Sequence, residues 1–101
     1  LPADALLRLT QLEQLVCVRC DLHGGLPHSL ATLTALQRIV LSGNELDGEL
    51  PVALPPALQH FVVDGNKFTG RLPIALIAAP QLVALDVARN ALDHELEPYV
   101  Q

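Results

Sequence analysis

The chain repeats one pattern of apolar residues four times, and this repetition limits the folds that are open to it. When Leu12, Leu36, Leu58 and Leu82 are taken as starting points, successive stretches are offset by 24, 22 and 24 residues. Each stretch has apolar residues at offsets 0, 3, 5 and 10, and an Asn or Cys at offset 8. Periods of this size are typical of proteins that stack one supersecondary unit on the next, because a single unit cannot bury its apolar face alone.

Composition agrees with a repeated aliphatic core and excludes several classes of protein. Leucine supplies 22 of the 101 residues, whereas only three residues are aromatic and both Trp and Met are absent. The net charge of −5 argues against a basic nucleic-acid-binding surface. No apolar run approaches the ~20 residues that span a bilayer. We therefore expect no nucleic-acid partner and no membrane insertion.

The repeated stretches match the pattern L-x-x-L-x-L-x-x-N/C-x-L, and three of them continue into an L-x-G-x-L-P segment at residues 22–27, 46–51 and 68–73. This sequence resembles the leucine-rich repeat family, in its plant-type subclass, over essentially the whole chain. The resemblance implies an α/β-type solenoid, a leucine-rich repeat arc. Its short strands would form a parallel sheet on the concave face, with helical turns or extended segments on the convex face.

The repeat boundaries predict a single segment built of successive turns. Residues 1–11 read as the tail of a preceding repeat, 12–35, 36–57 and 58–81 as full repeats, and 82–101 as a degenerate or truncated repeat. Neither end carries a polar capping motif, which solenoids need for solubility. We therefore expect a part of a longer protein, with contacts to flanking repeats or assembly neighbours at both ends.

One position of each repeat is expected to turn inward and satisfy backbone groups at a bend. These structural ladder residues are Cys20, Asn44, Asn66 and Asn90. The register also gives Cys17 an inward strand position, equivalent to that of Leu41 in the next repeat. We therefore expect two free, buried thiols, and a disulfide between them is disfavoured because both cysteines would have to leave their repeat positions.

Cys17 and Cys20 also have the C-x2-C spacing found in zinc modules, and His23 and His28 follow them. Structural zinc needs four ligands that converge on a tetrahedron. The repeat register instead assigns His23 to an outer edge and His28 to the convex return. We therefore expect no metal site and no cofactor.

Ser42, His60 and Asp64 form the one constellation that suggests catalysis, because neighbouring repeats bring all three to the concave surface. Nothing in the sequence supplies an oxyanion hole or a pocket, and an open sheet does not exclude water. We therefore expect no enzyme activity.

The outward strand positions form columns that run across the repeats. One column contains Val16, Val40 and Val62, then Asp86, and Val18 lies beside it. Such an apolar stripe either marks a binding surface or reflects the preference of strands for β-branched residues. The candidate partner-binding residues on the concave face are Val16, Val18, Val40, Val62, Arg38, His60, Asp64, Asp86, Arg19 and Arg89.

These features predict a non-catalytic module that recognises a protein partner through its concave sheet. One alternative is a structural subunit or spacer, packed in a large assembly through its ends and convex side. A second is a fragment of an extracellular leucine-rich repeat receptor. Free thiols, and the lack of a Ser or Thr two residues after Asn44, Asn66 and Asn90, favour an intracellular location. The resemblance keeps an extracellular or cell-surface location open.

Overall fold

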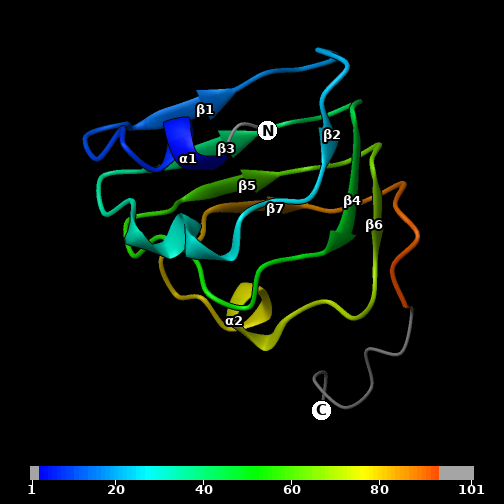
Figure 1. Ribbon diagram of the computed structural model, residues 1–101. Helices are drawn as coiled ribbons and strands as arrows, with labels where there is room; N and C mark the ends of the chain where they lie inside the picture. The colour runs from blue at the N-terminus through cyan, green and yellow to red at the C-terminus, as the bar shows by residue number, and fades with distance from the viewer. Residues whose placement is uncertain (1–2, 94–101) are drawn as a thin grey trace.

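A computed structural model describes residues 3–93, and it shows a coil of stacked turns (Figure 1). Predictions for the last repeat that concern residues 94–101 lie outside the described residues. The elements, in chain order, are α1 (Ala3–Leu6), β1 (Gln14–Val16), β2 (His23–Gly24), the 3-10 helix η1 (His28–Thr32), β3 (Arg38–Val40), β4 (Glu45–Glu49), β5 (His60–Val62), β6 (Lys67–Thr69), α2 (Ile74–Ile77) and β7 (Ala84–Asp86).

The first sheet contains one strand from each repeat, in the order β1-β3-β5-β7, and all its strands are parallel. Residues at the same repeat offset are direct neighbours across the strands. Val16 lies opposite Val40, Val40 opposite Val62, and Val62 opposite Asp86. The predicted solenoid with a short-stranded parallel sheet is therefore confirmed.

A second parallel sheet, in the order β2-β4-β6, was not predicted from the sequence. Its strands run across the direction of the first sheet, along an adjoining side of the coil (Figure 1). Leu46 and Phe68 fill the core side of this sheet and are fully buried. Gly48 and Gly70 have φ angles of +79° and +80°, a left-handed conformation that favours glycine. Gly48 is the next-to-last residue of β4, and Gly70 directly follows β6.

The core lies between the sheets and the convex returns. Ile39 and Phe61 point inward from the first sheet, and Leu30, Leu33 and Leu76 meet them from the returns that contain η1 and α2. Both helices begin directly after a proline, whose fixed φ suits a helix start and whose missing N–H leaves no donor unpaired. The return between β4 and β5 forms no helix, and it contains the sequence Pro-Pro at positions 55–56. This return instead contains bends and a turn, in which the N–H of Leu58 donates to the carbonyl of Pro55 at 3.1 Å.

Buried asparagine side chains tie each repeat to the one before it. The Asn66 amide Nδ2 donates to the carbonyls of Leu41, in the preceding repeat, and Val63, in its own, at 2.9 and 3.0 Å. Its Oδ1 accepts from the backbone N–H of Leu46 at 3.0 Å. Asn44 and Asn90 make equivalent bonds one repeat earlier and one repeat later.

The prediction of two free, buried thiols is wrong. Cys17 and Cys20 form a disulfide, Cys20 is exposed, and Cys17 is only half-buried. The reason is the shape of the bend at the end of the strand. It brings the Cα atoms of these two repeat positions to 5.8 Å, within the range that a disulfide needs, so neither cysteine has to leave its position.

We expect the substitution Asn66→Ala to destabilise the fold by about 1–3 kcal/mol, because it leaves the buried N–H of Leu46 without its partner. It also removes one of the two amide donors to each of the carbonyls of Leu41 and Val63, which Asn44 and Asn90 still contact. Urea unfolding monitored by circular dichroism measures this change. Asn90→Ala is the control, because Asn90 is less buried and its loss should cost less. Equal losses for the two variants would contradict this account.

Candidate functional site

The outer face of the first sheet carries an apolar patch, the valine stripe, which consists of Val16, Val18, Val40 and Val62. Val16 and Val18 are 52% and 43% exposed, and Val40 and Val62 are half-buried. The register makes Val16, Val40 and Val62 consecutive neighbours in one column. Asp86 follows them in the fourth repeat and is exposed.

Polar side chains border the valine stripe on the side where the strands begin. Arg38 and His60 are register neighbours on β3 and β5, and both are half-buried. They continue a column that starts at Gln14 and ends at Ala84. This edge of the stripe therefore carries one permanent positive charge and one imidazole.

On the other side of the stripe, Asp64 connects three repeats. Ser42 Oγ donates to Asp64 Oδ1 at 2.5 Å, and Arg89 Nη2 donates to Asp64 Oδ2 at 2.6 Å. Asp64 is buried beneath these partners, although its strand position faces outward. The Ser42 hydrogen bond, and after it the Arg89 hydrogen bond, hold the pKa of Asp64 below its ordinary value of 3.8. The Arg89 side chain stays 77% exposed, so its guanidinium is oriented and also accessible.

Ser42 was not among the binding residues predicted from the sequence. The available signal was its repeat offset, which it shares with Asp64 in the next repeat. The bond between them also bears on the catalytic constellation. Ser42 donates its proton to a carboxylate that is a weak base, and within residues 3–93 His60 forms no hydrogen bond with either partner. The structure thus links Ser42 to Asp64 and leaves His60 apart from them.

The column at the end of the strands has an arginine in the first and last repeats and a glycine in the two middle repeats. Arg19 and Arg89 have φ angles of 53° and 54°, and the equivalent residues of the middle repeats are Gly43 and Gly65, at +70° and +69°. A Cβ on Gly43 would lie 2.9 Å from Arg19 Cγ, so the Arg19 side chain occupies the space above this glycine. In the described part of the chain, no acidic side chain forms an ion pair with Arg19.

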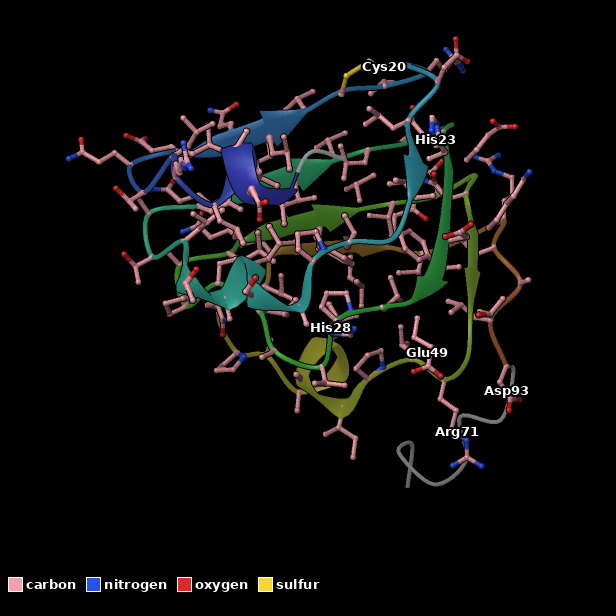
Figure 2. All side chains as sticks on the ribbon, viewed as in Figure 1. Cys20, His23, His28, Glu49, Arg71 and Asp93 are labelled. Carbon is pink, nitrogen blue, oxygen red and sulfur yellow. A yellow bond between two sulfur atoms is a disulfide. The ribbon has the colours of Figure 1, made fainter. Side chains whose placement is uncertain are left out.

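The histidines near the cysteines do not complete a metal site. In Figure 2, His23 lies on β2 and His28 lies on the return below it, away from Cys20. Among the described residues, no three His, Cys, Asp or Glu side chains converge on a common point. Within the same part of the chain, no helix is long and apolar enough to cross a membrane.

Comparisons with known proteins agree with this architecture. The Leucine Rich Repeat family model matches residues 35–56. A chain of the BIR3–SERK2 complex from Arabidopsis thaliana is 32% identical with a TM-score of 0.73, over 81% of this chain and 45% of that one. The Arabidopsis receptor kinase HAESA, in complex with the peptide hormone IDA and the co-receptor SERK1, is 29% identical with a TM-score of 0.81, over 86% and 15% of the two chains. A plant ice-binding protein is 30% identical with a TM-score of 0.77, over 86% and 29%.

The stacked turns and two parallel sheets define a repeat solenoid. The family model over residues 35–56 and the solved structures support a leucine-rich repeat solenoid arc, which is similar to plant receptor ectodomains. The chain spans less than half the length of each of the three solved chains that it resembles. A comparison with curated proteins gives no significant sequence match.

We expect Ser42→Ala and Arg89→Gln each to raise the pKa of Asp64 toward 3.8, because each removes a hydrogen bond that lowers this pKa, and Arg89→Gln also removes the favourable charge of the guanidinium. When folding lowers the pKa of a carboxyl group, the group stabilises the native state at pH values above its pKa in the unfolded chain. This stabilisation is lost as the pH falls through the lower pKa of the folded state. Titration of the Asp64 side-chain carbonyl carbon by NMR measures both shifts. An Asp64 pKa that stays unchanged in either variant would contradict this account.

Proposed function

We propose that this chain is a non-catalytic protein-interaction module and that it recognises a protein partner through the concave face of its first sheet. The observation that carries the proposal is the exposed valine stripe. Two of its four valines have about half of their surface in contact with solvent, on a face where the neighbouring positions are polar. Contiguous exposed apolar surface is typical of interaction sites, and solenoids commonly bind through their concave sheet.

The surroundings of the valine stripe support the same function. Arg19, Arg38 and His60 border it in the first three repeats, whereas Asp86 continues it in the fourth. An apolar centre with a charged rim is the usual arrangement of a protein interface, in which the centre supplies affinity and the rim supplies specificity. We therefore propose a partner surface with an apolar centre and two acidic groups, one near Arg38 where the strands begin and one near Arg19 where they end.

The solved structures give this proposal further support. HAESA was solved with a peptide hormone and a co-receptor, and BIR3 with SERK2. The plant ice-binding protein has a similar fold, so the fold alone does not identify a ligand. The proposal of a protein partner therefore rests on the exposed side chains of the first sheet.

A fragment of an extracellular receptor is the second candidate, and a specific observation favours it. The Cys17–Cys20 disulfide is a type of bond that persists mainly in oxidising compartments. This observation removes the free thiols, which were one of the two grounds for expecting an intracellular location. Both candidates use the same binding face, and they differ in where the parent protein is found.

The test uses the parent protein with the triple substitution Val16/Val40/Val62→Glu. We expect it to weaken capture of the partner at least tenfold, roughly the loss of 1.4 kcal/mol, because three carboxylates would replace the apolar centre of the interface. Affinity capture with mass spectrometry identifies the partner, and titration of the purified partner measures the loss.

The matched control is Val52/Ile74→Glu, since these side chains are 70% and 60% exposed at the start of the convex returns. All three proteins must have the same circular dichroism spectrum and melting temperature. A partner that is lost from the control and kept by the triple variant would reject the concave face. It would favour a structural spacer that contacts its neighbours through the convex side.

A further inference from the structure

The disulfide of the first repeat occupies the place of a hydrogen bond found in the later repeats. In each of those, the asparagine Nδ2 donates to the carbonyl of the residue three positions earlier in the same repeat. The pairs are Asn44 with Leu41 at 2.9 Å, Asn66 with Val63 at 3.0 Å, and Asn90 with Val87 at 3.1 Å. Cys20 and Cys17 occupy the same two offsets and are joined covalently instead.

The ring closed by this disulfide contains only Val18 and Arg19 between the two cysteines. Arg19 has a φ of 53°, a conformation that side chains other than glycine adopt at a cost. Gly43 and Gly65 adopt it freely in the next two repeats. In the fourth repeat Arg89 adopts it while its side chain is held by Asp64 at 2.6 Å. For Arg19, the constraint is supplied by the disulfide.

The rest of the bend is held from the second repeat. The N–H groups of Cys17 and Arg19 donate to carbonyls of β3 and of the bend after it, both at 2.9 Å. The N–H of Cys20 donates to Asn44 Oδ1 at 2.8 Å. None of these hydrogen bonds involves a sulfur atom. Opening the disulfide therefore keeps the first repeat stacked on the second and removes only the covalent bond within the bend.

The two sulfur atoms differ in how accessible they are. Cys20 is exposed beside β1 at the edge of the molecule, where Figure 2 shows the sulfur–sulfur bond. Cys17 is half-buried and packs against the core. An external nucleophile therefore reaches the sulfur of Cys20 first, and the sulfur of Cys17 is the leaving group.

We propose that the Cys17–Cys20 disulfide is a reversible thiol-exchange site, that its reactant is a low-molecular-weight thiol, and that its opening releases Val18 and Arg19 from their fixed conformation. An external thiolate attacks Cys20 Sγ and forms a mixed disulfide, while Cys17 leaves as a thiolate and takes a proton from water. A second external thiolate attacks the external sulfur of the mixed disulfide and releases Cys20. The protein disulfide gains two electrons, and two external thiols are oxidised to one disulfide.

This site has a consequence for the proposed function. Val18 and Arg19 belong to the proposed binding face, so opening the disulfide alters one end of that face. The consequence for binding rests on the proposed function, whereas the exchange site itself does not. The test below therefore uses no partner, and its result is independent of the result for the valine variants.

The experiment treats the full chain with excess reduced glutathione under native conditions, counts thiols by alkylation and mass spectrometry, and follows amide hydrogen exchange by NMR. We expect two thiols per chain, and exchange of the Arg19 and Cys20 amides that is roughly five- to thirty-fold faster, the factor that corresponds to the cost of the left-handed conformation. The Gly65 amide, bonded to Ala88 at 3.0 Å, is the internal reference and should not change.

Two variants separate the disulfide from the chemistry of the bend. Cys17→Leu/Cys20→Asn reproduces the residues of the second repeat, so its amides should stay protected with or without glutathione. Arg19→Gly keeps the disulfide and removes the conformational cost, so it should be reduced to two thiols with little change in amide exchange. A disulfide that resists glutathione, or complete reduction with unchanged exchange at Arg19 and Cys20, would overturn the proposal. So would an Arg19→Gly protein whose amides respond as strongly as those of the original chain.

Discussion

The side-chain amide of the buried asparagine is the interaction on which the rest of this solenoid depends. A bend at the end of each strand leaves backbone donors and acceptors that turn away from the sheet, and burying them unpaired would cost several kcal/mol per repeat. Asn66 satisfies such groups in two repeats at once: those of Leu41 and Leu46 in the preceding repeat and that of Val63 in its own. Because each amide reaches the preceding repeat, it fixes both the bend and the stacking of the turns.

Because the turns are stacked in a fixed register, residues that recur along the sequence form a continuous surface on the first sheet. Residues with equal offsets become neighbours, so Val16, Val40 and Val62 meet although they are 24 and 22 positions apart in the chain. The same stacking buries Asp64 at an outward position, because Ser42 and Arg89 approach it from the repeats on either side. Proximity between repeats thus creates both the apolar stripe and the charged bridge beside it.

In the first repeat, a different bond holds the bend at the end of the strand. Where later repeats use an asparagine hydrogen bond across three positions, Cys17 and Cys20 use a covalent bond. Both cysteines lie at the repeat positions that the sequence predicts, but they are not the free thiols that those positions suggested. The bend brings their Cα atoms to 5.8 Å, a distance that repeat offsets alone do not reveal. The hydrogen bond of Asn44 to Leu41 shows that these two offsets lie close together in the other repeats as well.

The solenoid, the parallel first sheet and the columns on its outer face can be predicted from the order of residues. They depend only on the repeat period and on the alternation of buried and exposed residues along a strand. The second sheet, the disulfide and the bridge from Ser42 through Asp64 to Arg89 appear only in the folded molecule. Each of these depends on how sharply the chain bends and on how closely two repeats approach. Such distances follow from the packing of the whole coil, and no local pattern of residues encodes them.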